Sequence, residues 1–136
     1  MATIGGRLEM LKVNLADGYE TAIEQRIGVA LPVSWVSVPN PDPRPITTTV
    51  DGVAAAGVFR QGLAAGGAVF RRLEGIWFSQ GKFYFTATSG GDACLGQIWV
   101  YDPKLETLTL VFETPNQRPK FPGQHCRQST RRPYRV

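Results

Sequence analysis

The stretch EGIWFSQGKFYFTATSGG, residues 74–91, decides the fold of this 136-residue chain. Its first apolar residues lead into Ser79-Gln80-Gly81, a turn that has glycine at the flexible position. The residues after the turn then alternate between two faces, with Phe83, Phe85 and Ala87 on one and Tyr84, Thr86 and Thr88 on the other. Such a period of two is typical of a β-strand. The stretch therefore predicts a β-hairpin, and a glycine-rich loop, SGGDACLG, follows it.

Two more strand-like stretches come next, QIWVYDP (97–103) and KLETLTLVFETP (104–115), separated by the turn signal Asp102-Pro103. The second stretch predicts one face with Leu105, Thr107, Thr109 and Val111 and another with Leu108, Leu110 and Phe112. Three strands of this length at short, regular spacing form an antiparallel meander, the unit of a propeller blade or part of a sandwich. A blade has four strands, so the sequence predicts a fourth after Glu113-Thr114-Pro115.

The residues before the hairpin are less regular. Residues 6–13 and 27–38 alternate roughly and predict strands, whereas PNPDPRP (39–45) is a loop, because proline removes donors and biases its neighbours to extended conformations. A short helix is predicted over residues 50–61, weakened by two glycines at roughly 1 kcal/mol each. The sequence shows no apolar run of membrane-spanning length and no visible signal peptide.

The final segment, GQHCRQSTRRPYRV (123–136), has four arginines and no acid. The chain has 15 Lys and Arg against 11 Asp and Glu, so without these arginines 15 − 4 = 11 basic residues balance the acids. The basic character therefore belongs to this tail alone. The tail could be a nucleic-acid-binding arm, or a metal site at His125 and Cys126, or a peptide without a role. The cysteines, Cys94 and Cys126, have no zinc or disulfide-framework spacing and are predicted to be free thiols.

Three motifs in order, RLEG (72–75), YFTATSGGD (84–92) and GQIWVYDP (96–103), resemble the PhoX-type alkaline phosphatases. The resemblance extends over about residues 6–122. It implies an all-β fold that is a fragment of a β-propeller: an antiparallel meander forming about one incomplete blade, with flanking strands and loops. It also implies hydrolysis of phosphate monoesters with an iron and calcium cofactor, and export, usually by the twin-arginine route. The expected partner is a phosphate-ester substrate, with no nucleic acid and no membrane.

In that family the segment after the last strand motif usually reads like PDNI followed by VSPRGGL. One permitted set of codons for the tail, read one base later, gives DNIAVSPRGGLIV directly after Pro122. We therefore interpret residues 1–122 as a partial PhoX-like domain and residues 123–136 as a frameshifted tail. In this reading His125 and Cys126 carry no function. Unpaired sheet edges then predict poor solubility.

Glu74 is the residue to which the resemblance assigns a role, that of a metal ligand. Calcium prefers carboxylate oxygens, and a glutamate between Leu73 and Gly75 at the start of a strand would face a propeller's central channel. One carboxylate cannot hold a multinuclear centre, so the remaining ligands are expected on other blades. The sequence assigns no catalytic residue, and this chain alone is expected to be inactive.

Other residues that could bind a ligand are explained more simply by a structural role. The loop Thr88–Asp92 could bind an anion through its amides, but an inter-strand turn with a capping aspartate is favoured. Arginine suits phosphate recognition, yet Arg60, Arg71 and Arg72 are interpreted as solvated charges. The aromatic residues of the meander are predicted to form core; they are Trp77, Phe78, Phe83, Tyr84, Phe85, Trp99 and Tyr101.

The sequence therefore predicts part of a metal-dependent phosphatase. Two alternatives stay open. One is a non-catalytic β-propeller that binds a partner, because fold alone does not imply function. The other is a short protein whose basic tail binds nucleic acid in a salt-dependent way.

Overall fold

The computed structural model describes residues 5–43, 48–50, 53–55 and 57–115, and it confirms an all-β fold with one short helix. The elements in chain order are β1 (Glu9–Val13), β2 (Ala30–Ser37), β3 (Thr48–Val50), β4 (Val53–Ala55), α1 (Gly57–Ala64), β5 (Leu73–Ser79), β6 (Lys82–Ala87), β7 (Gln97–Asp102) and β8 (Thr107–Glu113).

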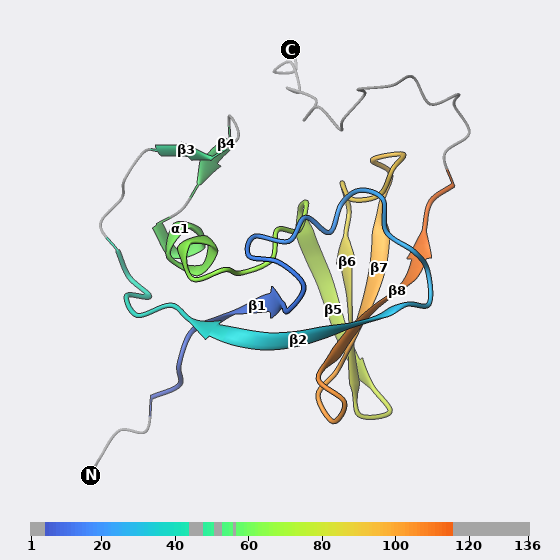
Figure 1. Ribbon diagram of the computed structural model, residues 1–136, viewed down its shortest axis with the longest axis horizontal. Helices are drawn as coiled ribbons and strands as arrows, with labels where there is room; N and C mark the ends of the chain where they lie inside the picture. Colours follow the sequence, from blue (N-terminus) through green and yellow to red (C-terminus); the bar gives the residue numbers. More distant parts are fainter. Residues whose placement is uncertain (1–4, 44–47, 51–52, 56, 116–136) are drawn as a thin grey trace, which may run out of the picture.

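Strands β5 to β8 form an antiparallel meander in which each strand pairs with the next in sequence. β2 then pairs with β8, and β1 pairs with β2, which gives the six-stranded order β1-β2-β8-β7-β6-β5. Figure 1 shows β2 running across the view to the lower part of the upright meander, with β1 next to β2 and to the left of the meander, so that the sheet is strongly curled. This arrangement is consistent with a fragment of a propeller blade, and β3 and β4 form a separate two-stranded sheet.

The β5–β6 hairpin is the element that the opening stretch predicted. Its two-residue turn has Gln80 at φ 50° and Gly81 at φ 76°. Two successive positive φ values are typical of the type I′ turn, whose twist matches that of the flanking strands. The pairs Ser79↔Lys82 and Trp77↔Tyr84 follow directly from this turn.

The count of three strands from the sequence is wrong, because the residues on both sides of the Gln80-Gly81 turn form strands and the meander already contains four before Thr114. A propeller blade therefore reaches its usual strand count within the described residues. The fourth strand that we expected after Pro115 falls at residues outside the described part of the chain.

The core lies between the concave side of the meander and strands β1 and β2. It consists of buried apolar side chains from both parts: Leu11, Val13, Leu31, Val33, Ala68, Ala87, Trp99, Leu108 and Leu110. Phe70, Phe85 and Tyr101 pack against this cluster from its margin. The strand pairing β2–β8 thus brings residues about 80 positions apart in sequence into one core.

The predicted faces of β8 are correct for Leu108 and Leu110 but wrong for Phe112, which is exposed. The register of β7 and β8 shifts between Ile98 and Trp99, so Ile98 pairs with Phe112 whereas Trp99 pairs with Leu110. One extra residue in a strand reverses the alternation beyond it. This β-bulge turns Phe112 away from the core.

The helix also differs from the prediction over residues 50–61, since α1 is Gly57–Ala64 and β4 occupies part of the predicted range. The segment before α1 is rich in β-branched residues, and Val50 pairs with Val53 in the β3–β4 hairpin. Such side chains favour extended structure. Gly62, inside the helix, is explained by packing, because a Cβ there would collide with the Met10 side chain of β1.

The β7–β8 turn is held by Asp102, whose Oδ1 accepts hydrogen bonds from the backbone N–H groups of Lys104 (2.9 Å) and Leu105 (3.2 Å). Desolvation opposes ionisation of this carboxyl group, but these two hydrogen bonds and the charge of Lys82 outweigh it. The pKa of Asp102 therefore lies below its ordinary value. The ionised aspartate fits the tight turn predicted by Asp102-Pro103.

Candidate functional site

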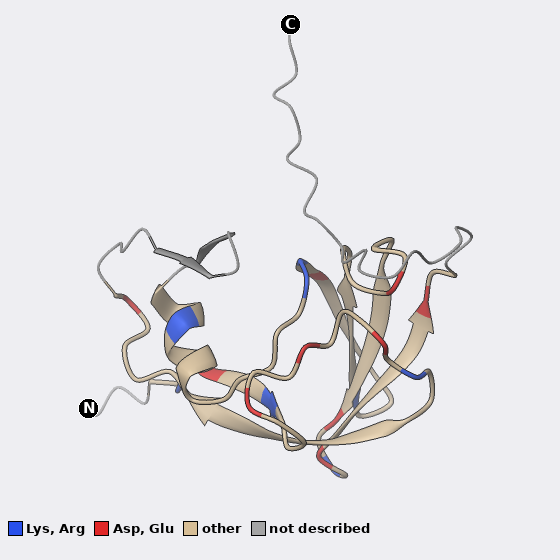
Figure 2. Ribbon diagram, turned by 45° about the horizontal axis from the view of Figure 1, so that its top comes forward, with Lys and Arg blue, Asp and Glu red and all other residues tan. Residues whose placement is uncertain are grey.

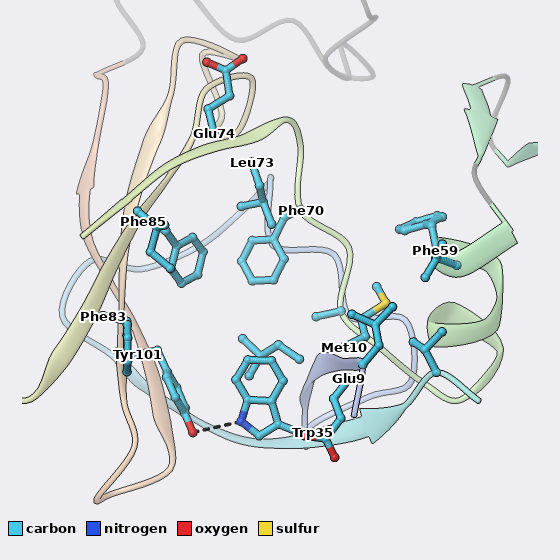
Figure 3. Close-up of a pocket in the computed structure, with 16 residues that line it drawn as sticks. Glu9, Met10, Trp35, Phe59, Phe70, Leu73, Glu74, Phe83, Phe85 and Tyr101 are labelled. Atoms are coloured by element: carbon cyan, nitrogen blue, oxygen red, sulfur yellow. Dashed lines mark hydrogen bonds between the residues drawn. The ribbon is translucent and has the colours of Figure 1, made fainter. Parts of the chain in front are cut away.

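Glu74, the predicted metal ligand, is the second residue of β5 and is exposed. Its Oε1 accepts a 2.7 Å ion-paired hydrogen bond from Nε of Arg72. The side chains of Arg72 and Glu74 remain 57% and 48% exposed. Figure 3 shows the carboxylate pointing away from the apolar side chains of the neighbouring cavity. Glu74 therefore presents a solvent-accessible anionic oxygen pair at the rim of that cavity.

The backbone before Glu74 is held by the end of β6. Arg72 has φ 58°, in the left-handed region, and its carbonyl oxygen accepts hydrogen bonds from both the N–H (2.9 Å) and the hydroxyl (3.2 Å) of Thr88. The Ser89 N–H donates to the Arg71 carbonyl. A non-glycine residue keeps a positive φ only where its surroundings demand it. These bonds determine where the Arg72–Glu74 pair lies.

Arg71 points in another direction and forms an ion pair with Glu20. Both side chains are only 29% exposed. The segment around Glu20 runs parallel to residues near Val69, with Thr21 N–H donating to the Val69 carbonyl at 3.0 Å. The segment between β1 and β2 that contains Glu20 and Thr21, called the N-terminal segment here, is thereby held against the residues that lead into β5.

Gln97 is the central buried polar residue of this region and is 2% exposed. Its amide nitrogen donates to the Thr21 carbonyl (3.0 Å) and to Glu113 Oε1 (2.9 Å), and its amide oxygen accepts from Trp99 Nε1 (3.2 Å). Sequence reasoning missed this residue, because glutamine is mostly exposed and no motif marks it. Gln97 links β7, β8 and the N-terminal segment below the candidate site.

Replacing Gln97 with methionine is expected to reduce the free energy of unfolding by about 2–4 kcal/mol. The substitution keeps the side chain's approximate shape but leaves the Trp99 indole N–H and the Thr21 carbonyl without this partner, at about 1–2 kcal/mol each, the lower part of the usual range for an unsatisfied buried group. Urea unfolding followed by circular dichroism measures the effect.

The matched control is Gln61→Met on α1, where the amide nitrogen donates to the exposed Asn40 carbonyl at 2.8 Å. We expect this control to cost less than about 1 kcal/mol. Equal costs for the two variants would contradict the role of Gln97 as a buried link.

The glycine-rich loop is a turn, as favoured, rather than an open anion cradle. Its N–H groups donate to protein carbonyls: Gly90 to Ala87, Gly91 to Ala22, Cys94 to Gly91 and Gly96 to Gly90. Oδ1 of Asp92 accepts from the backbone N–H of Glu24 at 2.8 Å. Asp92 therefore ties this loop to the backbone at Glu24, between β1 and β2. The prediction of a free thiol at Cys94 is wrong, because this cysteine is disulfide-bonded; cysteine pairing depends on distances in the fold and not on spacing in the sequence.

The charged candidates do not converge on one point. Arg71 and Arg72 have different carboxylate partners, and Arg60 lies on α1. In Figure 2 basic and acidic positions are interspersed over the ribbon. Within the described residues no group of three or more His, Cys, Asp or Glu could hold a metal ion. His125, Cys126 and the tail arginines lie outside the described residues.

An apolar cavity of about 760 Å³ adjoins Glu74. Its lining comes from β1, β2, α1 and the concave side of the meander, and includes Leu8, Met10, Leu11, Trp35, Phe59, Phe70, Leu73, Ile76, Phe83, Phe85 and Tyr101, with Glu9 and Glu74 as its charged members. Trp35 Nε1 donates to the Tyr101 hydroxyl at 3.0 Å (Figure 3). The volume is within the usual range for ligand pockets, but the charged carboxylate of Glu74 lies at the rim of the cavity and not inside it.

The aromatic residues divide into two groups. Trp99 is fully buried, and Phe85 and Tyr101 pack against the core, as predicted. Trp77, Phe78 and Phe83 are 47%, 62% and 37% exposed, so the prediction that they are core is wrong. Trp77 and Phe78 lie on β5, which has a neighbouring strand on one side among the described strands.

None of the helices in the described residues has the length and apolar character to cross a membrane. Comparison with known proteins identifies one family model that matches: alkaline phosphatase PhoX, over residues 2–131. No curated protein and no solved structure matches the chain.

Proposed function

Because the chain belongs to the alkaline phosphatase PhoX family, we propose that it carries part of a metal-dependent site that hydrolyses phosphate monoesters. Glu74 contributes one carboxylate ligand to a calcium and iron centre. The observation that carries the proposal is the family match over nearly the whole chain, together with an accessible carboxylate at the start of β5.

The donor chemistry of Glu74 fits a hard cation, since calcium takes carboxylate oxygens. A single carboxylate is not a complete site, and the described residues supply no cluster of three potential ligands. The remaining ligands therefore come from sequence outside the described residues. The 136-residue chain by itself is expected to be inactive.

Metal ions in such a site bind the phosphate, neutralise its charge and activate or position the nucleophile. The chain's own contribution is to hold Glu74 at a defined place. Thr88 fastens the Arg72 carbonyl, and the Arg71–Glu20 pair fastens the preceding residue. The Arg72 guanidinium pairs with Glu74 and would be suited to contact a phosphate oxygen if Glu74 held a metal ion.

We also propose that residues 123–136 are an out-of-frame translation. Natural selection has then acted on the amino-acid sequence of residues 1–122 and not on that of the tail. The support is the DNIAVSPRGGLIV reading, which continues the family pattern after Pro122. The family match itself extends to residue 131, so the boundary at Pro122 rests on the alternate reading alone.

Sequencing the gene through the codons of residues 114–136 and several hundred bases beyond tests the tail. A one-base correction that opens a long frame beginning Pro-Asp-Asn supports the proposal. Codons incompatible with that reading would rule it out.

The corrected protein then tests the function. It is assayed with a chromogenic phosphate monoester in the presence of calcium and iron, and again after chelation. Metal-dependent hydrolysis supports the proposed site, whereas a folded, metal-loaded and inactive product favours a propeller that only binds partners. Binding of nucleic acid that disappears when residues 123–136 are deleted would instead favour the basic-tail protein.

A further inference from the structure

Among the strands that the structure describes, β5 is the last of the six-stranded sheet and pairs only with β6. Every residue of Leu73–Ser79 is exposed. Among the described residues, no backbone hydrogen bond joins this strand to any segment other than β6. Figure 1 shows β5 at the margin of the upright meander. One row of main-chain donors and acceptors therefore faces outward.

The hairpin turn determines which groups these are. In a two-residue hairpin the flanking pair, here Ser79 and Lys82, exchanges hydrogen bonds, and every second pair does the same. Trp77 therefore uses its N–H and carbonyl toward Tyr84 of β6. Ile76 and Phe78 direct their N–H and carbonyl groups to the open edge, which can accept another strand.

Natural edge strands are commonly protected by lysine, proline or inward-pointing charge. The sequence of β5, LEGIWFS, has no lysine and no proline. A β-bulge can also protect an edge, but the register shift between β5 and β6 lies between Leu73 and Ile76, so the regular pairing from Ile76 to Ser79 is not interrupted. Its one charged residue, Glu74, is already paired with Arg72 of the same chain. The apolar side chains remain uncovered, with Ile76 66%, Trp77 47% and Phe78 62% exposed. The edge is therefore open to pairing and has apolar side chains on both faces.

We propose that two copies of this chain associate by antiparallel pairing of β5 with β5, centred on Trp77. In this register Ile76 of each copy lies opposite Phe78 of the other. The outward groups of these two residues then form four main-chain hydrogen bonds across the dyad. The two Trp77 side chains lie opposite each other, in the position where cross-strand aromatic pairs stabilise a sheet.

The charges of β5 permit this arrangement. Six residue steps separate the two Glu74 residues, or roughly 20 Å along an extended strand. That distance exceeds the Debye length of about 8–10 Å at moderate salt, so the two carboxylates do not repel each other appreciably. In this register the outward hydrogen-bonding groups and the apolar side chains of one β5 strand meet the matching groups of an identical strand. The edge therefore fits a second copy of this chain.

The test is sedimentation equilibrium of the full 136-residue chain between about 1 and 300 μM, a range that detects a small, weak interface. The average mass is expected to rise from 14.9 kDa toward twice that value. Ile76→Lys places a charge on the edge and is expected to weaken association at least tenfold. Leu105→Lys, at a 71% exposed position between β7 and β8, is the matched control and leaves association unchanged.

Phe78→Pro provides a second variant that is independent of side-chain charge. It removes an outward N–H that β6 does not use, and proline is tolerated on edge strands in that position. It is also expected to weaken association at least tenfold, with far-UV circular dichroism showing an intact sheet. A monomer at every concentration, growth beyond the dimer, or association unchanged in both β5 variants would overturn the proposal.

Discussion

Glu74→Gln is expected to reduce phosphate monoester hydrolysis by the frame-corrected, metal-loaded enzyme at least about 100-fold. Loss of groups that merely support a metal ligand already costs about 10–100-fold in affinity or activity, and Glu74 is proposed to be a ligand itself. Glutamine keeps the length of the side chain but replaces an anionic oxygen pair with a neutral amide. The measurements are kcat/KM and the bound calcium and iron content of the purified variant.

Glu9→Gln is the control, because Glu9 is the other charged residue that lines the cavity and it is also exposed. It is expected to retain activity and metal. If Glu74→Gln also retains both, Glu74 is a surface residue and the proposed ligand role is wrong.

The same substitution separates a metal role from a structural one. In the 136-residue chain, Glu74→Gln removes only the exposed pair with Arg72. Exposed ion pairs contribute about 0–1 kcal/mol, so the urea midpoint of this chain is expected to change little. A large loss of stability would show that any lost activity came from a damaged fold.

Trp99→Ala is expected to reduce the free energy of unfolding by about 3–5 kcal/mol, the usual cost of emptying a large buried aromatic site. Trp99 is fully buried, its ring meets Phe70 edge-to-face at a centroid distance of 5.9 Å, and its indole N–H donates to Gln97. Domains of this size have a total stability of about 5–15 kcal/mol. The variant therefore loses a large part of its stability, which is measured by urea unfolding.

Trp35→Ala is the matched comparison, because Trp35 is 45% exposed, meets the Tyr101 ring edge-to-face and donates a hydrogen bond to the Tyr101 hydroxyl. Its loss is expected to cost about 1–2 kcal/mol, since one edge-to-face pair and one exposed hydrogen bond disappear. If Trp35→Ala destabilises the chain as much as Trp99→Ala, the core is centred on the cavity side and not on β7.

The candidate site was only partly readable from the sequence. Glu74 was identified through the family resemblance, because a single glutamate in LEGIWFS has no spacing pattern of its own. The pairing of Arg72 with Glu74, and of Arg71 with Glu20, depends on contacts between segments. Gln97 gave no signal, because its burial results from three segments that meet only in the folded chain.

The sequence by itself determined the meander. Alternation with a period of two, a two-residue turn at Gln80-Gly81 and a turn at Asp102 are local signals, and local backbone preferences enforce them. Tertiary structure decided the rest: the pairing of β2 with β8, the bulge that exposes Phe112, the later start of α1 and the bare edge of β5. These features depend on which distant segments pack together, and single-strand patterns do not encode the partner that a strand will find.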